Sequence, residues 1–185
     1  MYHKIIIGID QSYTSCGISV CCDGKLKLVR SIKFAGLTCK SEKRIKVRNE
    51  LAKILAKVAG QSEIVAIYCE RIRTFSQGAS QFISTKYIKA TGALIATIVD
   101  LAYEHDIPVY SVDTRAWKSQ VLGTSKSDPT GKKVASVRYI EALGFDLTRV
   151  SKKGKVTKDD DAADASCIAL YGFIPEPRQK LMKEF

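Results

Sequence analysis

Four acidic residues stand at positions where a carboxylate is costly. Asp10 follows the apolar run KIIIGI, and Glu70 follows the apolar run IVAIYC. Asp161 and Asp164 lie in an alanine-rich segment at a spacing of i, i+3, which places both on one face of a helix. Converging carboxylates repel one another unless a cation lies among them. The pattern therefore predicts that these four side chains form one metal-binding site.

The ligand atoms indicate which metal and which chemistry such a site would use. Oxygen-only ligands favour Mg²⁺ or Mn²⁺. Two such ions, about 4 Å apart, can activate a water and stabilise a leaving oxyanion in phosphodiester hydrolysis. The alternative is that each acid is only a cap or a turn residue. That alternative suits Asp159 and Asp160 at a helix start, but it does not suit Asp164 inside DASCIAL.

The charge balance points to a polyanionic partner. The chain has 30 Lys and Arg residues against 19 Asp and Glu residues, a net charge of +11. Such an excess favours nucleic acid first and a membrane surface second. No apolar run approaches the roughly 18–20 residues of a membrane span, and the first residues lack a signal-peptide layout. We therefore expect a cytoplasmic protein with no membrane partner.

The six cysteines are irregularly spaced and form no C-x-x-C motif. With only two histidines, His3 and His105, the sequence lacks the usual spacing of a zinc site. The pattern favours six reduced thiols in a cytosolic protein. A zinc site or a disulfide is the remaining alternative.

The elements that must position the acids follow from hydrophobic periodicity. Apolar runs predict five strands, at Lys4–Ile9, Ser15–Cys22, Lys25–Phe34, Ile64–Cys69 and Pro108–Val112. Helical patterns occupy Ser41–Val58, Gln81–Glu104, Gly131–Leu143 and Asp159–Leu170, with a helical turn at Arg115–Leu122. The basic stretch Arg149–Lys158 is predicted to be a polar loop.

This order predicts an α/β fold with a mixed five-stranded sheet, a β-meander followed by alternating α and β, with helices on both faces. If the first and fourth strands are neighbours, Asp10 and Glu70 lie side by side and the last helix packs across them. The length fits one domain over residues 1–173, followed by a charged tail over residues 174–185.

Three segments resemble the catalytic motifs of RuvC-type Holliday junction resolvases: IIIGIDQSYTSCGISV, IVAIYCE and DAADASCIAL. The resemblance implies an RNase H-like fold and an endonuclease of DNA recombination and repair. It implies Asp10, Glu70, Asp161 and Asp164 as ligands of two Mg²⁺ or Mn²⁺ ions, with Asp10 bridging them. It also implies a homodimer that nicks two opposed strands of a four-way junction.

The sequence departs from this family at two places. The stretch RIRTFSQGASQF after Glu70 is longer and more basic than the usual spacer, and the basic loop Arg149–Lys158 is longer than in cellular members. Both departures suggest a divergent member from a bacterial or phage-infected bacterial cell. They leave a strict sequence preference at the nick site in doubt.

Basic and aromatic residues are candidates for holding the DNA. The resemblance puts family lysines near Lys132 and Lys133; one of these two would stabilise charge on the attacked phosphate, and the choice stays open. Phe75 is a candidate for stacking on an unpaired base. The remaining candidates for phosphate contact are Arg71, Arg73, Lys86, Lys89, Lys118, Lys152, Lys153, Lys155 and Lys158. For each single lysine, an ordinary solvated charge is the alternative.

Three other functions compete with this interpretation. Another RNase H-like nuclease, acting on forks, flaps or RNA–DNA hybrids, would use the same carboxylates. A sugar-kinase or actin-like phosphotransferase is suggested by GIDQSYTSCG, but 185 residues hold only one copy of that duplicated fold, so we expect no nucleotide cofactor. A non-catalytic DNA-binding scaffold would be marked by loss of an acidic ligand, and all four acids are present.

Overall fold

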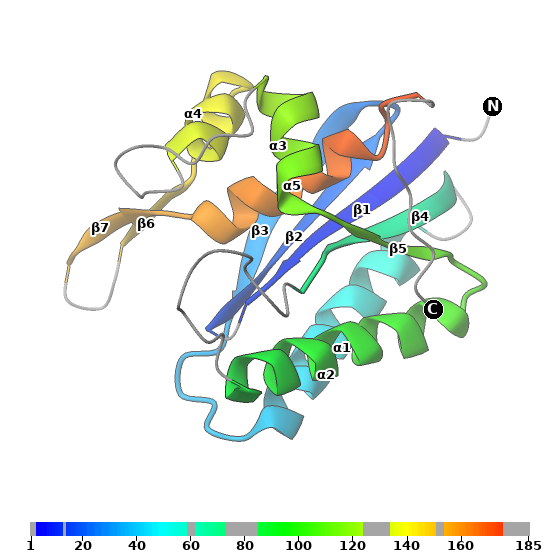
Figure 1. Cartoon of the computed structure of the whole chain (residues 1–185), viewed down its shortest axis with the longest axis vertical. Coiled ribbons are helices and arrows are strands. Elements are labelled where there is room, and N and C mark those ends of the chain that lie inside the picture. Colours follow the sequence, from blue (N-terminus) through cyan, green and yellow to red (C-terminus); the bar gives the residue numbers. More distant parts are fainter. Residues whose placement is uncertain are drawn as a thin grey trace.

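The computed structural model describes residues 3–12, 14–58, 62–72, 85–123, 134–150 and 154–175. Its centre is a five-stranded sheet with the spatial order β3-β2-β1-β4-β5 (Figure 1). The strands are β1 (His3–Gln11), β2 (Ser15–Cys22), β3 (Lys25–Lys33), β4 (Ser62–Glu70) and β5 (Val109–Val112). The predicted mixed five-stranded sheet is confirmed, although β1 continues one residue beyond Asp10.

The direction of the strands follows from their connections. β1, β2 and β3 pair antiparallel as a meander, with Asp23 and Gly24 at positive φ in the turn that joins β2 to β3. β4 pairs parallel with both β1 and β5. Parallel neighbours need long crossovers, and these are α1 (Lys40–Val58) and α2 (Thr85–Tyr103).

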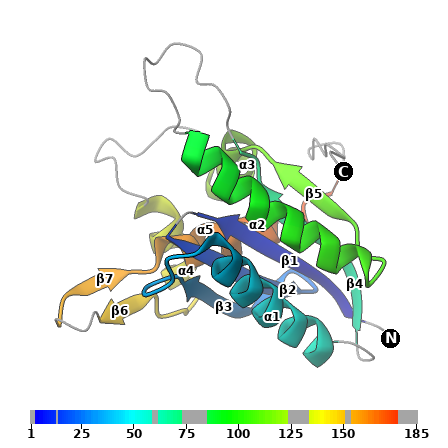
Figure 2. The same cartoon turned by 90° about the horizontal axis from the view of Figure 1, so that it is seen from below.

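Helices cover both faces of the sheet, as predicted (Figures 1 and 2). α1 and α2 pack on one face around a core that includes Ile7, Ile9 and Leu51. On the other face lie α3 (Thr114–Leu122), α4 (Val134–Ala142) and α5 (Asp160–Tyr171). Because side chains alternate along a strand, Ile6, Gly8 and Asp10 of β1 point to the α5 side.

The α5 helix packs unusually close to β1 and β2. A Cβ atom added to Gly8 would lie 2.2 Å from the carbonyl oxygen of Ala165, and one added to Gly17 would lie 2.0 Å from that of Asp161. The facing side of α5 is built from alanines and is buried. Glycine on the sheet and alanine on the helix therefore let the two backbones touch, and this contact brings Asp161 over the cross-strand partner of Asp10.

The predicted loop Arg149–Lys158 is wrong in part. β6 (Thr148–Val150) and β7 (Val156–Lys158) pair antiparallel as a separate two-stranded sheet, which projects away from the main sheet in Figures 1 and 2. The lysines of this stretch suggested a loop. Its β-branched residues, among them the cross-strand pair Val150 and Val156, favour strands, and the stretch forms strands at both ends.

Other element boundaries differ less from the prediction. The predicted helical turn Arg115–Leu122 is the nine-residue helix α3, which Asp113 caps by accepting a hydrogen bond from the backbone N–H of Arg115. The predicted starts of two helices, at Gln81 and Gly131, lie outside the described residues. Phe173 and Ile174 pack against the core beneath α5, while the rest of the predicted tail, from residue 176, also lies outside the described part. No helix within the described ranges is long and apolar enough to cross a membrane.

The contact between Gly8 and α5 predicts the effect of a single methyl group. Gly8→Ala should lower the free energy of unfolding by about 3 kcal/mol, since backbone rather than a flexible side chain occupies the space. Gly92→Ala in α2 is the matched control. Its Cβ would meet only Ile72 at 3.9 Å, so helix propensity should raise stability by up to about 1 kcal/mol. Chemical denaturation of both variants checks this, and equal stabilities would contradict the close packing.

Candidate active site

Asp10 and Glu70 lie on neighbouring strands at the same end of the sheet. Ile9 of β1 pairs in parallel with Cys69 of β4, so the next positions, Asp10 and Glu70, are side by side. Both share the strand face of Ile6 and Tyr68, which belong to the core beneath α5. Asp10 is only 2% exposed, and Glu70 is half-buried.

The other two acids come from the beginning of α5. Asp161 is 8% exposed and Asp164 is 2% exposed, both within the buried stretch of the helix. Asp161 lies against Gly17, which pairs with Asp10 across β1 and β2. The pKa of Cys16 on β2 reports this crowding: burial raises it most, and the charges of Asp10 and Asp161 raise it further. Asp10, Glu70 and Asp161 thus belong to the α5 side of one sheet end, and Asp164 lies buried three residues further along the same helix.

Three hydroxyl groups donate hydrogen bonds to these carboxylates. Ser15 Oγ donates to Asp161, and Ser136 Oγ donates to Asp164 Oδ1 at 2.5 Å. Thr114 Oγ1 donates to Glu70 Oε1 at 2.6 Å. The hydroxyls come from β2, α4 and α3, so each of these three elements orients one acid.

Sequence reasoning did not single out these hydroxyls. For Ser15 and Thr114, the neighbouring sequence did carry a signal. Ser15, Gly17 and Ser19 alternate with larger apolar residues along β2, which marks a strand face that a helix can approach closely. Thr114 follows the helix cap Asp113. Nothing in the sequence linked Ser136 to Asp164.

The N-terminus of α5 is fixed by its cap and by the β6–β7 hairpin. Asp159 accepts a hydrogen bond from the backbone N–H of Ala162 at 2.8 Å, which confirms the predicted cap role. Arg149 at the base of the hairpin forms an ion pair with Asp159. Desolvation lowers the pKa of Arg149, while the charges of Asp161 and Asp160 oppose that shift. This arginine, which the sequence analysis did not select, therefore faces the acidic helix end.

The donor set fits a hard divalent cation. The four carboxylates and their hydroxyl partners offer only oxygen, the ligand atom that Mg²⁺ and Mn²⁺ prefer. Beside Glu70, Gln11 donates through Nε2 to the Glu70 carbonyl, and its buried Oε1 has no hydrogen-bond partner. Gln11 follows Asp10 directly along β1, so its side chain leaves the strand on the face opposite the four acids.

Another group of possible metal ligands lies away from the four acids. Within the described part of the chain, the group of three possible ligands whose atoms all lie within 4.8 Å of one another is elsewhere, at His3, Cys22 and Asp23.

The described basic candidates fall into different environments. Lys89 is exposed on α2, and Lys155 is exposed on the β6–β7 hairpin. Lys118 of α3 lies with Nζ 5.3 Å from the centre of the buried Trp117 ring. Lys158 forms an ion pair with Glu141, so that interaction competes with any phosphate contact. Arg71 follows β4 directly and donates its backbone N–H to the Val112 carbonyl at 2.8 Å.

Several predicted site residues lie outside the described residues. They are Arg73, Phe75, Lys132, Lys133, Lys152 and Lys153, together with the side chain of Lys86. Their roles stay predictions.

Solved structures of junction resolvases share the architecture of this chain. RuvC of Thermus thermophilus in complex with a Holliday junction substrate matches with a TM-score of 0.64 and 16% identity, covering 90% of this chain and 91% of that chain. Another structure of Thermus thermophilus RuvC matches with a TM-score of 0.62 and 18% identity, covering 90% and 92%. The yeast mitochondrial Holliday junction resolvase matches with a TM-score of 0.56 and 15% identity, covering 90% and 76%.

At these identities the likeness establishes the fold. No family model matches the sequence, and no curated protein sequence matches it. The chain therefore has the RNase H-like architecture of RuvC-type resolvases, as predicted, and the suggested phage origin stays a prediction.

Cys39 and Cys69 should differ sharply in reactivity. Burial raises the pKa of Cys69 to about 12, whereas the hydrogen bond between exposed Cys39 and Ser41 lowers the pKa of Cys39. The thiolate is the reactive form. At pH 8 an alkylating reagent should therefore modify Cys39 early and Cys69 only after unfolding, as followed by mass spectrometry. Cys39→Ser should remove the early product, and labelling of both sites at one rate would contradict the buried placement.

Proposed function

We propose that this protein is a metal-dependent endonuclease that resolves four-way DNA junctions by phosphodiester hydrolysis. The observation that carries the proposal is the placement of Asp10 and Glu70 side by side on parallel strands, beneath a helix that buries Asp161 and Asp164. The shared fold with RuvC from Thermus thermophilus, solved with a Holliday junction substrate, supports the choice of DNA substrate.

In this proposal Asp10, Glu70, Asp161 and Asp164 hold two Mg²⁺ or Mn²⁺ ions. When bound, the ions would activate a water and stabilise the leaving oxyanion. The chain itself orients the ligands: Ser15, Ser136 and Thr114 each fix one carboxylate by a hydrogen bond. Lys132 or Lys133 would add positive charge at the attacked phosphate.

The net charge of +11 supports an electrostatic contribution to DNA binding. Among the described residues, exposed Lys89 and Lys155 and half-buried Lys118 are the candidates for phosphate contact. Resolution of a four-way junction needs two opposed nicks, so the proposal includes a homodimer with one site per subunit. Phe75, Arg71 and Arg73 would recognise the branch point.

Removing one carboxylate should abolish cleavage without abolishing binding. Asp10→Asn and Glu70→Gln should each reduce nicking of a synthetic four-way junction by at least about 100-fold, the upper range for loss of a supporting metal-site group. Asp100→Asn is the matched control, since this exposed acid lies on α2 across the sheet. Nicking is measured with and without Mg²⁺, and junction binding is measured by mobility shift.

The substrate panel distinguishes the proposed function from its alternative. A four-way junction, a Y-fork, a linear duplex and an RNA–DNA hybrid are compared at one Mg²⁺ concentration. Paired nicks on the junction support resolution, whereas preferred cleavage of hybrid or fork supports another RNase H-like nuclease. Wild-type activity in Asp10→Asn would refute the proposed site.

The hydroxyl partners allow a finer comparison along one strand. Ser15 and Ser19 both lie buried on β2, but Ser15 donates to Asp161 while Ser19 donates to the Leu28 carbonyl at 2.8 Å. Ser15→Ala should raise the Mg²⁺ concentration needed for half-maximal cleavage by about 10- to 100-fold, because the Asp161 carboxylate loses the hydrogen bond that orients it. Ser19→Ala should leave that concentration unchanged. Equal effects of the two variants would assign Ser15 to packing alone.

A further inference from the structure

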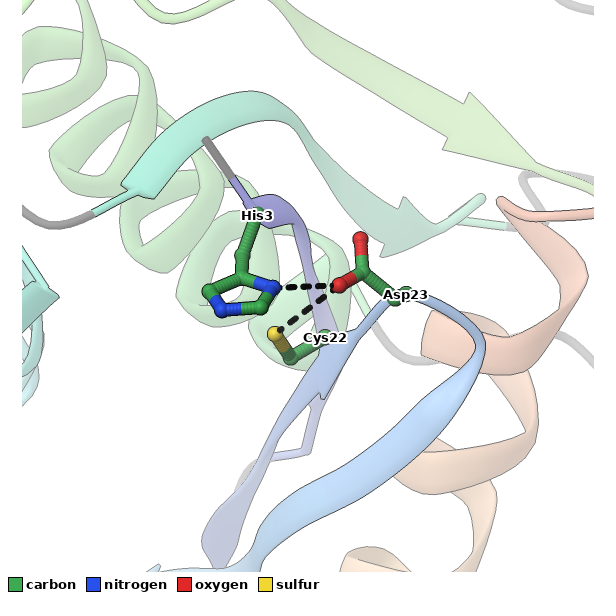
Figure 3. Close-up of side chains that lie close together, drawn as sticks. All are labelled: His3, Cys22 and Asp23. Carbon is green, nitrogen blue, oxygen red and sulfur yellow. Dashed lines mark hydrogen bonds and ion pairs between the residues drawn. The ribbon is translucent and has the colours of Figure 1, made fainter. Parts of the chain in front are cut away.

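A second group of possible ligands lies at the opposite end of β1 from the acidic site. His3 begins β1, Cys22 ends β2, and Asp23 follows in the turn to β3 (Figure 3). One ligand atom from each residue lies within 4.8 Å of the other two. His3 Nδ1 is 2.6 Å from Asp23 Oδ2, and Cys22 Sγ is 3.9 Å from the same oxygen.

The backbone holds this group in place. Asp23 donates its N–H to the Lys4 carbonyl at 2.9 Å, and Lys4 returns its N–H to Asp23 Oδ1 at 2.9 Å. Asp23 has a φ of 48° and Gly24 a φ of 77°, as a tight hairpin turn requires. The second carboxylate oxygen, Oδ2, is thereby presented to His3 and Cys22 (Figure 3).

The three ligand types differ from those of the acidic site. Imidazole nitrogen, thiolate sulfur and carboxylate oxygen form the donor set that zinc uses, commonly as three protein ligands with a water in the fourth position. Tetrahedral zinc bonds of about 2.0–2.3 Å hold neighbouring ligand atoms about 3.3–3.6 Å apart. The nitrogen–oxygen distance of 2.6 Å would widen and the sulfur–oxygen distance of 3.9 Å would shorten, each by less than about 1 Å to reach that range.

We propose that His3, Cys22 and Asp23 bind a zinc ion at the end of the sheet remote from the four carboxylates. On binding, the ion displaces the hydrogen-bond proton between His3 Nδ1 and Asp23 Oδ2 and the thiol proton of Cys22, and both protons are released to solvent. The ion then joins the first residue of β1 to the β2–β3 turn. Of the neighbouring residues Cys21 and Cys22, Cys22 is the one whose thiol can reach a metal ion. Cys21 is buried, and that burial is the main cause that raises its pKa to about 12. The site is independent of the proposed nuclease activity.

Cobalt is a spectroscopic probe that separates this site from the acidic one. Co²⁺ bound by a thiolate gives a sulfur-to-metal charge-transfer band, which an all-oxygen site does not give. We expect the band in the reduced wild-type protein, its loss on adding Zn²⁺, and its absence in Cys22→Ser. Cys39→Ser is the matched control because it removes an exposed thiol elsewhere, and Asp10→Asn controls for the carboxylates; both should keep the band.

Protection of the thiol gives a second readout that needs no DNA. One equivalent of Zn²⁺ should slow alkylation of Cys22 by about tenfold or more, on the scale of metal-site effects, and leave alkylation of Cys39 unchanged. His3→Ala and Asp23→Asn should each remove most of that protection. Asn tolerates positive φ, so Asp23→Asn keeps the turn, and circular dichroism checks the fold. A charge-transfer band that survives Cys22→Ser, or absence of zinc protection, would overturn the proposal whatever the nuclease assay shows.

Discussion

The backbone contact between α5 and the two strands β1 and β2 is the constraint on which the candidate site depends. Gly8 and Gly17 have no room for a Cβ atom, because carbonyl oxygens of α5 occupy that space. This packing distance decides where the first turn of α5 lies relative to the end of β1. A helix standing one side-chain layer further out would leave Asp161 and Asp164 away from the strand acids. Small residues at these contacts are therefore part of the site's geometry, although none of them offers a ligand.

Burying carboxylates carries a desolvation cost that the surrounding elements must offset. Ser15 and Ser136 supply hydroxyl donors to the α5 acids, and Thr114 supplies one to Glu70. Arg149 brings a positive charge to the acidic helix start from outside the main sheet. The neutral hydroxyls orient the acids without cancelling their charge, so the group keeps its attraction for a cation. Lysines in place of Ser15, Ser136 and Thr114 would have neutralised the negative charge of the acids.

The fold and the acids could be predicted because their signals are local. β-Branched runs mark the strands, and the i, i+3 spacing puts Asp161 and Asp164 on one helix face. The supporting contacts could not be predicted, because they join distant segments: Ser15 and Asp161 are 146 residues apart in the chain. The β6–β7 strands were missed because lysines masked a short β-branched pattern, and the His3, Cys22 and Asp23 group was missed because its spacing matches no familiar motif.

The order of the elements along the chain also decides at which stage of synthesis and folding the four acids can come together. Asp10 and Glu70 become neighbours only after a long-range parallel pairing, and α5, the last helix of the described chain, supplies the other two acids. During synthesis a domain folds as its segments emerge, and contacts of high sequence separation form late. A growing chain therefore carries only part of the acidic group until α5 has left the ribosome and docked. Hydrolytic competence, in the proposed nuclease, would arrive in one step with completion of the fold.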